Sequence, residues 1–326
     1  MKLATLRDGT RDGRLVVVSK DLARAALVEG AARTLQAALD HWDDVVGELE
    51  GLYSDLNAGR APGSFSFDPA QAAAPLPRAY QWLDASAFLS HGVLMQRALG
   101  LEINPQSDAA PLMYQGASDD FLGPNDPAPF PSEDDGIDFE GEFGVILVDT
   151  PMGVSPEAGE GAIRLLVQIN DWSLRGLAKR EMSSGFGFLQ AKPATAFAPV
   201  AVTPDELGDA WRDGRIDLPL RVTWNEAVFG QPLGGAMDYG FGQLIAHAAR
   251  TRRLRAGTIL GSGTVSNPDA EAVGSACISE RRALDAIAGR PQTAFARFGD
   301  RVRMEAVCLD GSPLFGPVDQ RIVKAD

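Results

Sequence analysis

The sequence predicts an α+β protein that is mainly β, with a small N-terminal α+β domain ahead of a larger β-rich domain. Three observations support this class. Helical segments do not alternate regularly with strands, so a βαβ arrangement is disfavoured. Residues 59–78 are rich in Pro, Gly, Ala and Ser and divide the chain. Short apolar runs of β type recur with turn residues between them, at 142–148, 165–169, 218–224, 258–260 and 302–308.

The N-terminal domain is expected at residues 1–72. Residues 1–19 predict two short strands, the second at 15–18, separated by Asp-Gly turn sequences. Residues 73–326 form the second domain, in which 242–253 predict a helix with one apolar face. In the first domain a helix should follow the strands, because apolar residues step by three or four along one stripe: Leu35, Leu39, Trp42, Val46, Leu49, Leu52 and Leu56.

The charge balance narrows the classes of partner. The formal net charge is -14, with 44 acidic against 30 basic side chains. A chain this acidic has no general affinity for nucleic acid or for anionic membrane surfaces. Apolar stretches such as 143–148 are far shorter than the roughly 20 residues that cross a bilayer, and the N-terminus lacks a signal-peptide core. We therefore expect a cytoplasmic protein.

Cysteine and histidine usage argues against a soft-metal scaffold. Cys277 and Cys308 are the two cysteines, and no Cys-x-x-Cys pair occurs, which disfavours a disulfide framework and a thiolate zinc site. With three histidines in the chain, a His-rich site is also disfavoured. His41 lies among aspartates beside the N-terminal helical stripe, where a solvated helix face explains it.

The sharpest local feature is Asp138-Phe139-Glu140-Gly141-Glu142, which runs directly into an apolar segment. In a strand, side chains two apart point to the same face, about 7 Å apart along the chain. Two carboxylates held side by side disfavour each other's ionisation unless a positive charge compensates. A divalent cation with oxygen ligands, Mg²⁺, Mn²⁺ or Ca²⁺, is the simplest compensation. The alternative is a solvated strand face at a sheet edge.

Two further segments offer acid and base groups. Asp171 follows the β-type run 165–169, and functional side chains often lie where a strand ends. The alternatives are that Asp171 caps a helix, or that it forms a surface ion pair with Arg175 four residues later. Asp84 and His91 are seven residues apart, which in a helix places both on one side. A neutral imidazole is the usual general base near pH 7. A structural, hydrogen-bonded histidine is the alternative.

Lys192 precedes a proline, and Thr264 lies in Gly261-Ser262-Gly263-Thr264-Val265-Ser266. This loop lacks the Lys-Ser/Thr ending of a phosphate loop and the Gly-x-Gly-x-x-Gly dinucleotide pattern, so nucleotide binding is not supported. It can expose backbone N–H groups and the Thr264 hydroxyl to a small anion. An ordinary turn is the alternative.

Taken in this order, these segments resemble the fumarylacetoacetate hydrolase family over roughly residues 75–323. The resemblance rests on an aspartate seven before a histidine, Glu-x-Glu entering a strand, Asn-Asp-Trp-Ser-x-x-Arg, a lysine with a following threonine, and Gly-Ser-Gly-Thr-Val-Ser. It implies a mixed β-sandwich roll for the catalytic domain, a homodimer, and a divalent metal, Mg²⁺ first and Mn²⁺ or Ca²⁺ as alternatives. The implied metal residues are Asp84, Glu140, Glu142 and Asp171, with the matching Lys192 and Thr195.

The resemblance also implies a reaction. It is carbon–carbon bond hydrolysis in a 2,4-dioxo acid of the fumarylacetoacetate or acylpyruvate type, in aromatic catabolism. His91 takes a proton from water and Glu280 orients it, while Arg175, Lys192 and Thr264 stabilise negative charge. Tyr114, in Pro-Leu-Met-Tyr-Gln-Gly, matches a substrate-contacting tyrosine.

Two departures from the fumarylacetoacetases stand out. Ala178 occupies the place of a glutamine three residues after the arginine, which leaves the substrate open, and Glu280 aligns only loosely as the partner of His91. The alternatives are a lyase of the same superfamily, either a 2-oxo-pentenoate-type hydratase or an oxaloacetate-type decarboxylase, and a noncatalytic metal-dependent binding protein.

Overall fold

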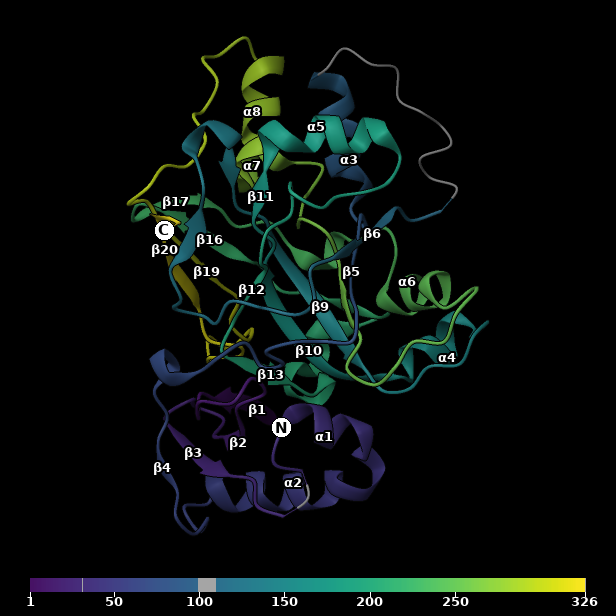
Figure 1. Cartoon of the computed structure of the whole chain (residues 1–326), viewed down its shortest axis with the longest axis vertical. Helices are drawn as coiled ribbons and strands as arrows, with labels where there is room; N and C mark the ends of the chain where they lie inside the picture. Colours follow the sequence, from purple (N-terminus) through teal and green to yellow (C-terminus); the bar gives the residue numbers. More distant parts are fainter. Residues whose placement is uncertain (31, 99–109, 326) are drawn as a thin grey trace.

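The computed structural model describes residues 1–30, 32–98 and 110–325. One 11-stranded sheet runs through the molecule in the order β4-β3-β2-β1-β13-β10-β9-β18-β5-β6, with β12 paired to β10 (Figure 1). Its strands are β1 (Lys2–Leu6), β2 (Arg14–Val18), β3 (Arg24–Leu27), β4 (Phe65–Ser66), β5 (Trp82–Ala85), β6 (Met113–Gly116), β9 (Gly141–Leu147), β10 (Ile163–Asn170), β12 (Ala196–Phe197), β13 (Val200–Val202) and β18 (Ile259–Gly261).

A second sheet of five strands has the order β17-β16-β19-β20-β7. Its strands are β7 (Ala128–Phe130), β16 (Arg221–Trp224), β17 (Ala227–Gly230), β19 (Arg301–Glu305) and β20 (Val318–Lys324). Two short pairs complete the strands: β8 (Ile137–Asp138) with β11 (Ser173–Leu174), and β14 (Trp211–Arg212) with β15 (Arg215–Ile216). The predicted α+β, mainly β class is confirmed.

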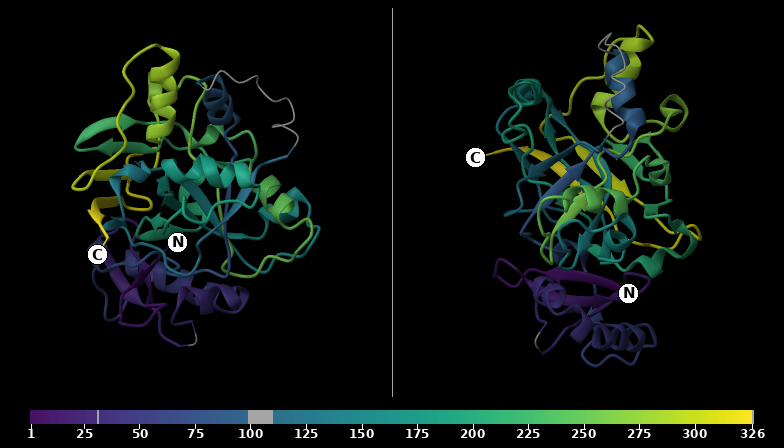
Figure 2. Two further views of the ribbon diagram at one scale, coloured as in Figure 1. Left: turned by 45° about the horizontal axis from the view of Figure 1, so that its top comes forward. Right: turned by 90° about the vertical axis from the view of Figure 1, so that its right-hand side faces the viewer.

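The helices lie at the two ends and along one side of the molecule (Figure 1). They are α1 (Leu35–Asp40), α2 (Trp42–Asn57), α3 (Leu89–Ala98), α4 (Pro156–Glu160), α5 (Arg175–Ser184), α6 (Phe241–Ala248), α7 (Ala270–Val273) and α8 (Ile278–Ile287). Figure 2 shows α3 and α8 side by side at the end opposite the N-terminal unit. Among the described residues, no helix is long and apolar enough to span a membrane.

The N-terminal unit contains the two strands that the sequence predicts, as β1 and β2, and the predicted helix is divided. His41 interrupts it with φ -130° and ψ 35°, so α1 ends and α2 begins there. The apolar stripe nevertheless packs on the sheet, with Leu35, Leu49 and Leu56 buried. β1 pairs with β13, so one sheet continues from this unit into the rest of the chain. The domain boundary at residue 72 stays a prediction.

The strand pair β9 and β10 forms the centre of the large sheet. All seven residues of β9 are buried, because β10 and β18 flank it and both faces are covered. Burial on both faces explains the continuous apolar run that the sequence shows there. A Cβ on Gly144 would lie 2.6 Å from the Ile169 side chain, so the close packing of β9 on β10 requires glycine at this position.

Three predicted elements are shorter in the structure. β16 starts at Arg221 and not at 218, because Pro219 has no N–H for a strand ladder. α6 ends at Ala248, and the exposed segment 250–253 that follows offers no apolar side chain to pack. The predicted strand 302–308 is β19, which ends at Glu305.

Candidate active site

Three carboxylates meet where neighbouring strands of the large sheet end. Asp84 lies in β5, Glu142 in β9, and Asp171 directly after β10, and a ligand oxygen from each lies within 4.8 Å of the others. Their exposed fractions are 6%, 0% and 0%. β18 lies between β5 and β9, and its Gly261 pairs with Asp84. A Cβ on Gly261 would lie 2.5 Å from Asp84 Oδ1, so glycine makes room for this carboxylate.

The environment of this triad disfavours ionisation. Burial, followed by the charge of Asp171, raises the pKa of Asp84 to about 8. Burial and the charges of Asp84 and Asp171 raise the pKa of Glu142 well above its usual range. Neither Glu142 oxygen has a hydrogen-bond partner among the described residues. Buried carboxylates without donors are costly, so this triad fits a hard divalent cation with oxygen ligands.

Glu140 lies in a different environment, just before β9. Its Oε1 accepts from Arg175 (2.6 Å) and Thr264 (2.8 Å), and its Oε2 accepts from Ser173 (3.0 Å) and from Lys192. Burial acts to raise the pKa of Glu140, but the charges of Arg175 and Lys192 hold it below its usual range. The alternative of a solvated strand face is therefore wrong for both glutamates, because each is almost fully buried.

Asp171 is held by three side chains from other segments. Its Oδ2 accepts from Tyr114 Oη (2.5 Å) and Lys192 Nζ (2.6 Å), and its Oδ1 accepts from Thr195 Oγ1 (2.8 Å). Burial acts to lower the pKa of Lys192, but the charges of Asp171 and Glu140 raise it overall. Burial and the charge of Asp171 raise the pKa of Tyr114. Lys192 thus remains a cation that bridges the two carboxylates.

The helix-cap and surface-pair alternatives for Asp171 are wrong. The residue is followed by the short strand β11, and α5 begins only at Arg175, with Leu174 as its N-cap. Arg175 bonds Asp138 and Glu140 instead of Asp171.

His91 and Glu280 come together from two helices. His91 Nδ1 on α3 lies 3.7 Å from Glu280 Oε1 on α8, and Ser266 donates a hydrogen bond to the same oxygen. The His91 side chain is 19% exposed and that of Glu280 is fully buried. The predicted common helix for Asp84 and His91 is wrong: Asp84 belongs to β5, and the Ala87 N–H bonds Ser262 O before α3 begins.

The glycine-rich loop after β18 supports the carboxylates. Gly263 N donates to Asp84 Oδ1 (3.0 Å), and Thr264 donates to Glu140. The anions that the loop contacts are therefore carboxylates of the protein itself. The loop is more than an ordinary turn, because it donates hydrogen bonds to Asp84 and Glu140. Gly263 has φ +76°, and a Cβ there would lie 2.2 Å from Ala85 O.

The sequence assigned no role to four residues of this site. Asp138 accepts from Arg175 Nε (2.8 Å) and from the N–H groups of residues 278 and 279 (2.7 and 2.9 Å). Asp138 lies two residues before Glu140, so the strand alternation that pairs Glu140 with Glu142 also includes Asp138. The other three are Ser173, Ser266 and Cys277. Cys277 stands three residues before Glu280, at the spacing of a helix capping box.

Comparisons with known proteins find matches to both parts of the chain. The family model of the fumarylacetoacetate (FAA) hydrolase C-terminal domain matches residues 81–323, and that of fumarylacetoacetase N-terminal domain 2 matches residues 1–78. A fumarylacetoacetase from Caenorhabditis elegans is 30% identical over 197 residues, 52% of this chain and 47% of the relative. A 2,4-didehydro-3-deoxy-L-rhamnonate hydrolase from Sphingomonas sp. (strain SKA58) is 29% identical over 167 residues, 50% and 56% of the two chains. The chain thus spans about half the length of these curated relatives.

Solved structures share the fold over the whole chain. Maleylpyruvate hydrolase from Sphingobium sp. SYK-6, in complex with manganese (II) ion and pyruvate, has a TM-score of 0.65 at 17% identity and covers 100% of both chains. Other matched structures carry the names of isomerases. At such identities the likeness shows the fold alone.

Proposed function

Since the chain belongs to the fumarylacetoacetate hydrolase family, we propose that it is a metal-dependent hydrolase that cleaves a carbon–carbon bond in a 2,4-dioxo acid. The observation that carries the proposal is the pairing of His91 with Glu280 in the same structure as the buried Asp84, Glu142 and Asp171 triad. A base that activates water, added to a metal site, is what hydrolysis requires beyond a metal-assisted decarboxylation.

The proposed metal ligands are the triad Asp84, Glu142 and Asp171, with Glu140 as a fourth carboxylate. Oxygen ligation of this kind suits Mg²⁺, our first choice, as well as the Mn²⁺ named for a structural relative. When bound, the cation supplies Lewis-acid polarisation of the carbonyl oxygens of the substrate. Lys192 fixes the carboxylate of Asp171, and Thr195 holds its other oxygen.

The remaining residues have roles that follow from their placement. His91 takes a proton from water at Nε2, while the Glu280 carboxylate faces Nδ1 and orients the ring. Arg175 and Lys192 keep positive charge beside the carboxylates, where substrate oxyanions can bind. Tyr114, fixed by its bond to Asp171, presents its ring to the substrate, and Thr264 completes the polar wall.

The test is turnover of fumarylacetoacetate, acylpyruvates and oxaloacetate with Mg²⁺ or Mn²⁺, by wild type and by His91→Ala. We expect paired acid products from a dioxo acid, a loss of at least 100-fold in kcat for the variant, and unchanged metal affinity. His41→Ala is the matched control, since His41 is exposed at the α1–α2 junction and should leave turnover unchanged. Loss of metal binding together with turnover would make His91 structural.

A second candidate is an isomerase, hydratase or decarboxylase reaction at the same site, favoured by the isomerases among the structural relatives. Bicarbonate release from oxaloacetate without paired acids, or an isomerised product of unchanged mass, would decide for it. Tight binding of a dioxo acid with metal and no turnover of any substrate would instead identify a noncatalytic binding protein.

A further inference from the structure

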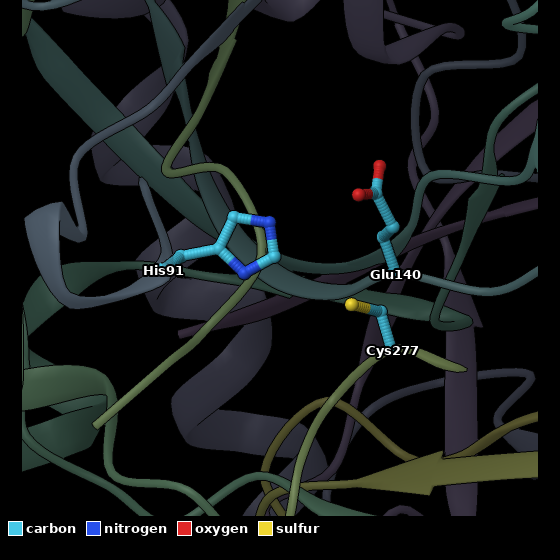
Figure 3. A group of neighbouring side chains, drawn as sticks. All are labelled: His91, Glu140 and Cys277. Carbon is cyan, nitrogen blue, oxygen red and sulfur yellow. The ribbon is translucent and has the colours of Figure 1, made fainter. Parts of the chain in front are cut away.

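Beside the oxygen triad lies a second cluster of different chemistry. Ligand atoms of His91, Glu140 and Cys277 all lie within 4.8 Å of one another. Figure 3 shows the Cys277 sulfur pointing toward the His91 imidazole, with the Glu140 carboxylate above Cys277 on the same side of the view. Cys277 is fully buried as the N-cap of α8, where its sulfur accepts the Glu280 N–H at 3.3 Å. The mechanism proposed above makes no use of this thiol.

The donor set separates the two clusters. Thiolate and imidazole ligands select zinc-like cations, whereas an all-carboxylate set selects Mg²⁺ or Mn²⁺. The triad of Asp84, Glu142 and Asp171 contains neither His91 nor Cys277. Glu140, the fourth carboxylate of the site proposed above, is the one residue that both sites could use, so a cation held by His91 and Cys277 leaves the triad intact.

We propose that His91, Cys277 and Glu140 form a second metal site, selective for a thiophilic divalent cation such as Zn²⁺, whose occupation inhibits the enzyme by capturing His91. Metal binding at this cluster stands on its own geometry. The inhibition rests on the proposed function, in which His91 is the base.

The distances allow the site to form with small movements. Zinc bonds of about 2.0–2.3 Å in a tetrahedron place neighbouring ligand atoms roughly 3.5 Å apart. The ligand atoms here lie within 4.8 Å, so a closure of about 1 Å suffices. The His91 side chain, 19% exposed, can supply this movement and the entry route. As the metal–sulfur bond forms, the thiol proton passes to solvent.

The three ligands contribute unequally. Glu140 already accepts from four donors, so its oxygen makes the weakest of the three bonds. The sulfur of Cys277 accepts a single N–H and faces the His91 imidazole, whose Nδ1 lies 3.7 Å from the Glu280 carboxylate. These two side chains therefore anchor the cation, and the fourth tetrahedral position is left to water.

The binding test is a Co²⁺ titration of the Mg²⁺-saturated protein, followed by the thiolate-to-cobalt charge-transfer absorption, which needs no turnover. We expect the band in wild type, its loss in Cys277→Ser, and at least tenfold weaker binding in His91→Ala. Cys308→Ser is the matched control, because Cys308 is half-buried near the Glu206 carbonyl, outside the cluster, and should keep the band. Serine also suits the N-cap, so Cys277→Ser should fold. If it does not, His91→Ala decides.

Absence of the band in wild type would overturn the proposal, as would its persistence in Cys277→Ser or unchanged Co²⁺ affinity in His91→Ala. The second measurement is Zn²⁺ inhibition of turnover at saturating Mg²⁺. We expect the half-inhibitory Zn²⁺ concentration to rise at least tenfold in Cys277→Ser and to stay the same in Cys308→Ser. Equal inhibition of both variants would refute the inhibitory role. Absence of any turnover would refute the proposed function and leave the cobalt result standing.

Discussion

Glu142→Gln keeps the shape of a buried side chain and removes one charge from the triad. In the metal-free protein the charges of Asp84, Glu142 and Asp171 repel one another once all are ionised. Two unit charges 4.8 Å apart interact by about 3 kcal/mol at an effective dielectric constant of about 20. Lys192, 2.6 Å from Asp171, offsets part of this repulsion. We expect Glu142→Gln to stabilise the metal-free protein by about 1–3 kcal/mol at pH 9.

The effect depends on pH in a direction that the pKa values fix. The folded-state pKa of Asp84, about 8, lies above its ordinary value of 3.8, so protonation of Asp84 stabilises the metal-free fold. That contribution is fully present below pH 3.8 and is lost as the pH rises through about 8. Glu142, with a raised pKa, behaves in the same sense. The difference between the variant and wild type should therefore shrink as the pH falls from 9 to 6.

With metal the sign reverses. A cation at 100 times its Kd stabilises the folded state by about 2.7 kcal/mol, which corresponds to about 5–10 °C in Tm. If losing the Glu142 ligand weakens binding by about 100-fold, the gain at the same concentration falls to about 0.4 kcal/mol, or about 1 °C. The same substitution should thus raise Tm in EDTA at pH 9 and abolish most of the metal-induced rise.

The measurement is calorimetric unfolding of both proteins at pH 6 and pH 9, in EDTA and in Mn²⁺. Glu48→Gln, at an exposed position of α2, controls for loss of one negative charge at the surface. A lower Tm for Glu142→Gln in EDTA at pH 9 would refute the repulsion argument. An undiminished response to Mn²⁺ would remove Glu142 from the metal site.

Three further outcomes follow from the same contacts. Asp138→Asn should destabilise the fold by about 3 kcal/mol or more, seen as a lower denaturation midpoint, because Arg175 loses a buried partner and α8 its capping charge; an unchanged midpoint would contradict this. Tyr114→Phe should weaken Mn²⁺ binding by about tenfold in calorimetric titration, since Asp171 loses one of its donors; unchanged affinity would show that Lys192 and Thr195 suffice. Apparent Mn²⁺ affinity should rise by up to about tenfold per pH unit until about pH 8, where Asp84 ionises, and then level off; a flat profile from pH 6 to 9 would contradict the raised pKa.

The central strands were predictable because β9 and β10 are buried on both faces, and such strands read as continuous apolar runs in any sequence. Short edge strands carry no such signal. β6, for example, has no fully buried residue, so the chain around Tyr114 gave no strand pattern. The break at His41 was also hidden, because both helices continue one apolar stripe.

The triad was predictable from its motifs, but the partners of each carboxylate were not. Strand periodicity places Glu140 and Glu142 together, whereas Arg175 and Lys192 reach Glu140 from segments 35 and 52 residues away in the chain. Such contacts depend on how β11 and the segment before β12 pack, which no local pattern encodes. Cys277 was set aside because no Cys-x-x-Cys pair occurs, although a histidine from α3 and Glu140 lie beside it in the structure.

The pKa values of Glu140 and Glu142 are shifted in opposite directions, which explains how one short segment can serve two purposes. Arg175 and Lys192 keep Glu140 ionised, so it acts as a fixed anion that positions cationic side chains beside the site. Glu142, two residues along, has carboxylate neighbours in place of these cations, and its pKa rises. Where the surroundings shift the pKa values of neighbouring acids apart, the two acids can have different functions. The positive charge that Glu142 lacks within the protein is what a bound divalent cation would supply, and for that reason we place the metal at Glu142 first and at Glu140 second.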